Sequence, residues 1–250
     1  FAKVVLIIVL AKYFSTRHVE LYRMRHILVS GLYVFLPCLL ILLEPELGSV
    51  LVLILLWIGV LIVSGIQLRQ FVWLCLAGLL VLVMSWSFLF KPYHKERVAT
   101  FLFPETAPLD IGWNQLQAKI AIGSGGLFGK GLEASQQVRS GFLPAAQTDF
   151  IFAGIVEQFG LVGALLVVLS LGLLAGRLIV ISLSGESNFP RLFAAGFCIV
   201  LIFQSGINLA MNLGLLPVIG IPLPFVSYGG SSLLAMFIGL GIVQSVQKHV

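Results

Sequence analysis

The chain has 250 residues, of which 59% are hydrophobic and only 10% are charged, and it carries a net charge of +5. Its mean hydropathy of +1.09 is far above that of a soluble globular domain. This composition excludes a soluble enzyme or a soluble binding module and indicates a membrane protein.

Long apolar runs recur along the chain, and their continuous Leu, Val and Ile content favours helices over the alternating strands of a membrane barrel. The runs cover residues 1–14, 28–43, 47–64, 71–90, 150–176, 192–212 and 231–247, the first being too short to cross a membrane alone. We therefore predict an all-α polytopic integral membrane protein with about seven transmembrane helices. Residues 1–250 are interpreted as a single membrane domain, and the start inside an apolar run without a basic leader predicts an N-terminally truncated chain.

Lys and Arg in the short connections predict which way the chain faces, because short cytoplasmic loops are enriched in both residues. Threading the runs through a membrane places these basic residues on one side: Lys12, Arg17, Arg23, Arg25, Arg69, Arg177, Arg191 and Lys248. The short connections on the other side, around 44–46 and 213–230, contain neither residue type. We predict that the basic side is cytoplasmic. The net charge then reflects topology and gives no reason to expect a nucleic-acid partner.

The first apolar run and the turn at 44–46 place charged residues close to the outer side. Lys3 lies in the outward half of the first run, where an ionisable side chain is a candidate functional residue. Its long side chain could equally reach the interface without a functional role. For Glu44 and Glu46, solvated acids that cap the next helix are as good an explanation as a functional site.

Residues 91–149 form the one long connection in this threading, and it falls on the outer side. A connection of this length is usually functional or disordered, and its aromatic and apolar content argues against disorder. We predict that this long extracytoplasmic loop carries the active site. Within it, residues 113–122 predict a short helix at the membrane surface, with Trp113, Leu116 and Ile120 on one face and Gln117 nearby.

The glycine-rich stretch at 121–131, "AIGSGGLFGKG", does not have the spacing of a nucleotide-binding loop. On composition alone it is typical of a flexible surface turn. The flanking side chains of Lys119 and Lys130 favour a second interpretation. Together with accessible glycine amides, they could hold a phosphate on the outer side.

Asp149 stands where the polar loop meets the next apolar run, and a carboxylate so close to hydrocarbon is costly unless it has a role. An N-cap at the start of a helix explains it without any catalytic function, because Asp is a favoured cap residue. A cap and an active-site carboxylate are compatible. Further along, residues 216–232 contain three prolines and a glycine pair, which predict a re-entrant or broken segment that lines a cavity.

Four stretches, in this order, resemble the SEDS family (shape, elongation, division and sporulation) of bacterial cell-wall polymerases. They are "EPELGS" at 44–49, "QAKIAIGSGGLFGKG" at 117–131, "LPAAQTDFIF" at 143–152 and "GIPLPFVSYGGSS" at 220–232. Their wording is closest to the RodA-like elongation branch, which is related to the FtsW division branch. Members have about ten spans, so the resemblance implies further spans upstream of Phe1. The chain departs from the family pattern at Ala145 and Gln147, where the family has Glu and His, and matches it at Thr148 and Asp149.

The resemblance implies a peptidoglycan glycosyltransferase of the bacterial cytoplasmic (inner) membrane. It would polymerise lipid II into glycan strands at the outer face by inverting transfer from a lipid diphosphate donor. Asp149 would be the catalytic general base. The substrate-binding residues implied for the diphosphates and sugars are Lys3, Arg97, Gln117, Lys119, Lys130 and Thr148. A divalent cation is left open, because no metal-ligand cluster in the sequence requires one.

The family also implies a protein partner, a class B penicillin-binding protein whose transpeptidase crosslinks the strands. Two other functions remain open at this point. One is a flippase or transporter of lipid-linked precursors, built from broken helices around a cavity. The other is a non-catalytic scaffold for the penicillin-binding protein. The concentration of ionisable residues on the outer side favours surface chemistry over transport.

Overall fold

The computed structural model describes residues 1–16, 24–44, 46–88, 92–103, 111–135, 137, 141–143 and 145–248. Arg17, Arg23 and several stretches of the 91–149 connection lie outside these described residues. Within the described part, every regular element is a helix and there is no strand.

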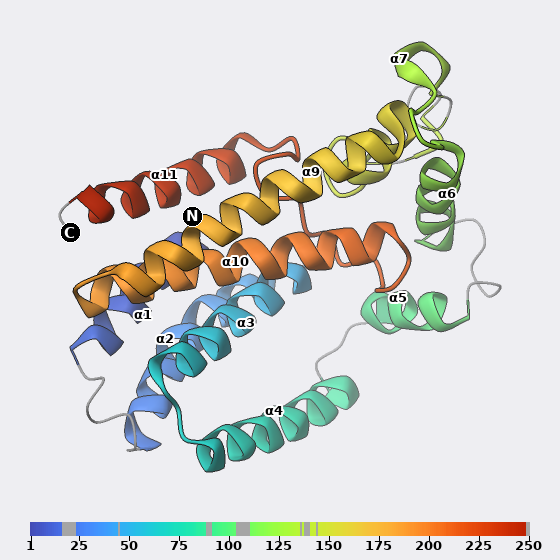
Figure 1. The fold of residues 1–250 in the computed structure, drawn as a ribbon. Coiled ribbons are helices and arrows are strands. Elements are labelled where there is room, and N and C mark those ends of the chain that lie inside the picture. The colour runs from blue at the N-terminus through green and yellow to red at the C-terminus, as the bar shows by residue number, and fades with distance from the viewer. Residues whose placement is uncertain are drawn as a thin grey trace.

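Each of the seven predicted apolar runs is a helix (Figure 1). These helices are α1 (Ala2–Ser15), α2 (Met24–Leu43), α3 (Leu47–Ser64), α4 (Leu68–Phe88), α9 (Ile151–Ser184), α10 (Asn188–Asn212) and α11 (Gly230–Lys248). In the described part of the chain, 6 helices are long and apolar enough to cross a membrane, and α1, with 14 residues, is shorter. The prediction of an all-α, multi-pass membrane protein is confirmed.

Helix α10 lies at the centre of the bundle, where it packs against α9, α1 and α3 (Figure 1). Its side chains Phe193, Phe197 and Leu201 are fully buried in the main apolar core. Helix α4, by contrast, is exposed nearly all round and lies apart from the other long helices. Because a helix that is apolar on every side is stable only in apolar surroundings, lipid is the natural neighbour of α4.

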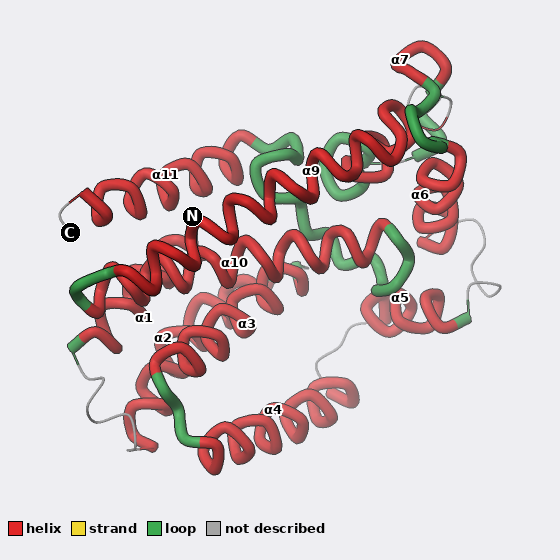
Figure 2. Tube along the Cα trace, in the orientation of Figure 1, coloured by secondary structure: helices red, strands yellow, loops and turns green. Residues whose placement is uncertain are grey.

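The described parts of the 91–149 connection form three helices at one end of the bundle, among the non-helical segments (Figure 2). They are α5 (Pro92–Leu102), α6 (Ile111–Ser124) and α7 (Gly131–Ala134). The helix predicted at 113–122 is confirmed as part of α6, which packs against α9. The apolar side chains of Leu116 and Ile120 point outward, whereas Ala118 and Ala121 are buried. An outward apolar face suits a helix at the membrane surface.

The glycine-rich stretch packs against a kink in α9 rather than forming a free surface turn. At Gly160 the backbone of α9 leaves the helical conformation (φ 66°, ψ −159°). The freed amide of Leu161 donates to the carbonyl of Gly126 at 2.9 Å, and the amide of Lys130 donates to the carbonyl of Glu157 at 2.9 Å. A Cβ atom at Gly129 would overlap the carbonyl of Gln158. Glycine therefore allows two backbones to meet directly.

Candidate functional site

A tight turn at residues 145–150 presents Thr148 and Asp149 at the start of α9. The carbonyl of Ala145 accepts hydrogen bonds from the amides of Thr148 (3.0 Å) and Phe150 (3.2 Å). Ala145 adopts φ 52°, a left-handed conformation that costs a residue with a Cβ atom about 1–2 kcal/mol. The strain indicates that surrounding contacts hold the turn in this shape.

The interpretation of Asp149 as the N-cap of the following helix is wrong. Helix α9 begins at Ile151 with Phe150 in the cap position, and no side chain there bonds to the helix. The amide of Ala153, in the first turn, donates instead to the side-chain oxygen of Asn212 at 3.1 Å. Asn212 belongs to α10, so tertiary structure supplies the cap and the Asp149 carboxylate is not needed for it.

Three successive carbonyls of the turn are anchored to other parts of the chain. Those of Gln147 and Thr148 accept hydrogen bonds from the Tyr228 amide (2.8 Å) and the Ser227 hydroxyl (2.6 Å). The carbonyl of Asp149 accepts two bonds from α10 side chains, from Asn208 Nδ2 at 2.9 Å and from Asn212 Nδ2 at 3.0 Å. The backbone of Asp149 is therefore held firmly in place.

The carboxylate of Asp149 is half-buried and accepts no hydrogen bond from the described part of the chain. A Cβ atom at Gly220 would lie 3.7 Å from its Oδ2 atom, so the carboxylate faces the connection between α10 and α11 (residues 213–229). Burial raises the pKa of Asp149 above its ordinary value, the positive charge of Arg97 lowers it, and the negative charge of Glu46 raises it. Burial has the largest effect, and the result is an unpaired carboxylate of increased basicity.

Arg97 reaches the same region from α5. Its Nη1 atom donates to the carbonyl of Val218 at 3.1 Å, and its guanidinium carbon lies 5.7 Å from the ring centroid of Tyr93. Its Nε atom is buried and has no hydrogen-bond partner among the described residues. Because buried donors are nearly always paired, a ligand oxygen is a natural acceptor for this one.

Lys3 approaches from α1. Its Nζ atom donates to Gln204 Oε1 at 2.9 Å, and Gln204 Nε2 donates to the carbonyl of Pro222 at 2.9 Å. Glu46 lies within electrostatic reach of both Lys3 and Asp149. The structure thus brings together Lys3, Arg97, Thr148 and Asp149 around the α10–α11 connection, and it adds Glu46, for which the sequence left two explanations open. This connection is irregular, as predicted, and side chains of the bundle bind its carbonyls.

The other predicted site residues lie at the edge of this group or outside it. The end of the Lys119 side chain lies against Gly214, two residues beyond the end of α10. Gln117 is buried on the inner face of α6. The Nζ atom of Lys130 lies 3.9 Å from Oε1 of Glu157, whose side chain is fully buried. Lys130 therefore has a structural role in holding the glycine-rich stretch on α9.

Sequence reasoning missed three amide side chains of α10, Gln204, Asn208 and Asn212. They lie within an apolar run, 1%, 0% and 0% exposed, and contact the turn, α1 and the α10–α11 connection. Their spacing of four residues was the available signal, because residues four apart lie on one face of a helix. A polar stripe within a membrane helix indicates internal bonding partners.

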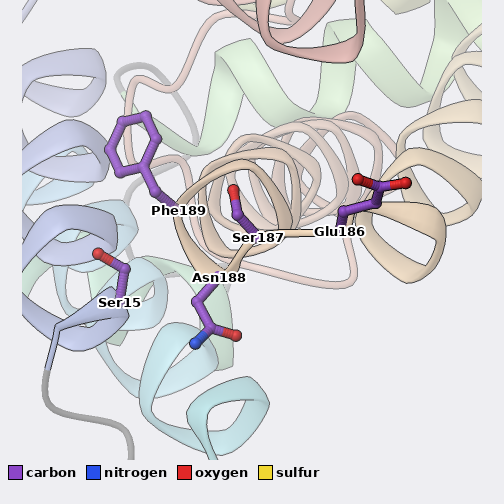
Figure 3. A pocket seen from close by; sticks show the side chains of 5 residues that line it. All are labelled: Ser15, Glu186, Ser187, Asn188 and Phe189. Atoms are coloured by element: carbon purple, nitrogen blue, oxygen red, sulfur yellow. The ribbon is translucent and has the colours of Figure 1, made fainter. Parts of the chain in front are cut away.

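A cavity of about 360 Å³ lies elsewhere, between the end of α1 and the link from α9 to α10 (Figure 3). It is lined by Ser15 and by residues 186–189. These residues are at the opposite end of α10 from Asn212, a separation of about 36 Å along a helix of this length. The cavity is therefore separate from the group around Asp149. Among the described residues, no cluster of three or more His, Cys, Asp or Glu could hold a metal ion.

Comparisons with known proteins place this arrangement in a family. Residues 1–250 match the model of the FtsW, RodA and SpoVE cell cycle proteins. The peptidoglycan glycosyltransferase MrdB of Escherichia coli is 39% identical over 227 residues, which are 88% of this chain and 60% of the relative. Stage V sporulation protein E of Bacillus subtilis is 37% identical, and the match covers 100% of this chain and 68% of that protein. The chain thus spans about three fifths of the length of MrdB.

Solved structures are also similar to the chain, among them the following two. A chain of a peptidoglycan synthase complex, described as coordinating polymerization and crosslinking, superposes with a TM-score of 0.79 at 33% identity. The match covers 98% of this chain and 67% of the other. The rod shape determining protein RodA of Thermus thermophilus gives a TM-score of 0.66 at 30% identity, over 98% of this chain and 63% of RodA. The chain therefore belongs to the FtsW, RodA and SpoVE family of membrane proteins, the family that its four motifs predicted.

Proposed function

We propose that the protein is a peptidoglycan glycosyltransferase that polymerises lipid II, with Asp149 as its general base. The observation that supports this most directly is the state of the Asp149 carboxylate. It is half-buried, its pKa is raised, and it has no hydrogen-bond partner in the described part of the chain. A carboxylate with these properties is suited to accept a proton from a substrate.

In the proposed reaction, a sugar hydroxyl of the acceptor attacks the anomeric carbon of the donor. A new glycosidic bond forms while the bond from that carbon to the diphosphate oxygen breaks, and the lipid diphosphate leaves with the electron pair. Asp149 takes the hydroxyl proton. One base is sufficient, because the diphosphate is a stable anion that needs no protonation to leave.

The cations around the α10–α11 connection are proposed to stabilise the leaving diphosphate. Arg97 has a buried Nε–H without a partner among the described residues, and Lys3 has donors beyond the one used by Gln204. Lys119, at the turn after α10, is proposed to meet the more exposed part of the same ligand, and Gln117 and Thr148 its sugar or phosphate oxygens. Lys130 is paired with Glu157, so it is proposed to act on the diphosphate only through the longer-range attraction of its positive charge.

The active site is proposed to face outward. Basic side chains lie near helix ends on the side of the bundle that contains the cavity lined by Ser15 and residues 186–189; they are Lys12, Arg25 and Arg191. This side is opposite to the end of α10 that contacts Asp149. If the basic side is cytoplasmic, Asp149 lies at the outer membrane surface. Lipid II fits this position, because its sugars project from the surface while its prenyl chain stays in hydrocarbon.

A class B penicillin-binding protein is the proposed partner. The similar chain in the solved peptidoglycan synthase complex supports it, since that complex is described as coordinating polymerization with crosslinking.

The test is polymerisation of purified lipid II by the natural-length protein with its partner, followed by gel analysis of the glycan strands. We expect Asp149→Asn to lower the rate by about 10²–10⁴-fold, the usual contribution of a general base. Glu186→Gln, a neutralised acid at the opposite end of α10, is the matched control and should retain full activity. Undiminished synthesis by Asp149→Asn would refute the assignment. Loss of partner binding in that variant would instead point to the scaffold function.

A further inference from the structure

We propose that Gln204, Asn208 and Asn212 form a polar ladder on α10 that positions the base Asp149 and the cation Lys3 relative to each other. These are positioning residues, since each acts through another group. The inference rests on the proposed function, because it assigns the ladder a part in the reaction that Asp149 would catalyse.

The ladder follows from helix geometry. Residues four apart lie one above another on a helix, so the three amides form one stripe along the outer half of α10. All three side chains are buried, and an amide in apolar surroundings is costly unless it is hydrogen-bonded. Their carboxamide nitrogens donate to the backbone carbonyls of Pro222, Ile221 and Asp149. The stripe therefore binds the backbone of two segments, the turn at 145–150 and the α10–α11 connection.

The middle and outer members set the position of Asp149. Both Asn208 and Asn212 donate to its carbonyl, and Asn212 Nδ2 also lies 3.2 Å from Asn208 Oδ1, which couples the two amides. The Asp149 carboxylate has no hydrogen bond of its own to the described residues. Its location therefore depends on the backbone that carries it, and the two asparagines hold that backbone to α10.

The inner member sets the position of Lys3. Gln204 accepts from Lys3 through one atom of its carboxamide and donates to Pro222 through the other. Its amide plane thus links α1 to the α10–α11 connection. Asn208, which holds the backbone of Asp149, also binds the carbonyl of Ile221, the residue before Pro222. The side chains that position Asp149 and Lys3 therefore bind adjacent residues of the same connection. A proton acceptor and a diphosphate-binding cation gain rate from such a fixed relative position.

Two tests separate the ladder from a simple loss of folded protein, which lowers the apparent kcat but changes neither KM nor the pH profile. Asn208→Leu, close in size but apolar, should lower kcat by about 10²-fold, the cost of misplacing a reacting group, with an unchanged KM for lipid II. It should also move the acid limb of the pH profile of kcat/KM to lower pH. A displaced Asp149 is better hydrated, and its pKa falls toward the ordinary value while Arg97 and Glu46 keep their charges.

Gln204→Met and Gln204→Glu form the second test. The Met variant loses both bonds and should raise the KM about tenfold or more, the effect of losing a fixed hydrogen bond to a charged group. The Glu variant keeps an acceptor for Lys3 but has no donor for the Pro222 carbonyl, so it should recover only part of this loss. Ser205→Ala is the matched control on the same helix, because the buried Ser205 hydroxyl has no hydrogen-bond partner among the described residues. It should leave kcat, KM and the acid limb unchanged.

The outcomes separate this inference from the proposed function. An Asn208→Leu enzyme with wild-type kcat and an unmoved acid limb, next to an inactive Asp149→Asn enzyme, overturns the ladder alone. An active Asp149→Asn enzyme overturns the proposed function, and the ladder with it. If Asn208→Leu fails to fold, the Gln204 pair decides. An equal KM in Gln204→Met and wild type then overturns the ladder, and recovery in Gln204→Glu supports it.

Discussion

The side-chain oxygen of Asn212 accepts the hydrogen bond of the Ala153 amide at 3.1 Å, while its nitrogen donates to the carbonyl of Asp149 at 3.0 Å. One buried side-chain amide therefore caps the N-terminus of α9 and also holds the backbone of Asp149, four residues before Ala153. This arrangement leaves the Asp149 carboxylate available for chemistry. Burial has the largest effect on the pKa of that carboxylate, and the charges of Arg97 and Glu46 modify it further.

The charges of Arg97 and Glu46 should move the pH dependence of activity in opposite directions. A general base works only when ionised, so the proposed role of Asp149 predicts that activity falls as the pH drops through its pKa. Arg97 lowers this pKa and Glu46 raises it. Arg97→Gln should therefore move the acid limb of kcat/KM to higher pH, and Glu46→Gln should move it to lower pH. The measurement is the rate of polymerisation from pH 4 to 8, and shifts of the same sign would contradict the assignment.

The glycine-rich stretch should respond to alanine according to position. Gly129→Ala combines φ 80° with overlap against Gln158, and should destabilise the protein strongly, by about 3 kcal/mol or more. Gly126→Ala has φ 57° in open space and should lose only about 1–2 kcal/mol from left-handed strain. Gly123→Ala lies in α6 with nothing within 4 Å and should be neutral or stabilising. Thermal unfolding in detergent measures all three, and a tolerated Gly129→Ala would disprove the packing role.

The pair of Lys130 and Glu157 should behave as a structural unit. Lys130→Met removes a cation that lies 3.9 Å from the fully buried Glu157 carboxylate. Because the Gln137 amide still donates to that carboxylate, the variant should destabilise the protein by only about 1 kcal/mol. Adding Glu157→Gln removes that charge and should restore most of the stability. The check is a double-mutant cycle on the thermal midpoint, with polymerisation measured in parallel. If stability returns but activity does not, Lys130 also contacts the substrate.

Lys119 should contribute to substrate binding without affecting the pH profile. Its charged end lies at the turn after α10. The pKa of Asp149 is set by burial, Arg97 and Glu46. Lys119→Met should raise the KM for lipid II by about tenfold, the effect of losing one charge-assisted contact. The control is Lys12→Met, an exposed lysine at the far end of α1. An unchanged KM in mixed micelles would remove Lys119 from the site.

The long helices were predictable because a membrane span must bury its backbone and present apolar side chains over about 20 residues. All seven apolar runs are helices, although α9 continues to Ser184, eight residues beyond the predicted end at 176. Its last turns contain apolar residues interrupted by Ser182 and Ser184, and each of these hydroxyls bonds to a backbone carbonyl. Hydropathy does not register polar side chains that are satisfied by the helix and its neighbours.

The site was predictable only in part, for a physical reason. Asp149 and Lys3 stand out because a charge near hydrocarbon is rare. Asn208 and Asn212 are neutral, and each looks like an isolated polar residue in an apolar run. Their role arises from contacts 59 and 63 residues away in the chain, which no local pattern records. The same holds for the cap of α9, which a local rule assigned to Asp149.

The contacts of α10 also set an order of assembly during synthesis. Asp149 enters the membrane region 59 residues before Asn208, and Lys3 precedes Gln204 by 201 residues. Until α10 and the following connection have left the ribosome, neither charged group has the partner that it has in the finished protein. A nascent chain arrested before residue 204 therefore contains Asp149 and Lys3 but not the amide side chains that contact them. These contacts can form only after α10 has been synthesised.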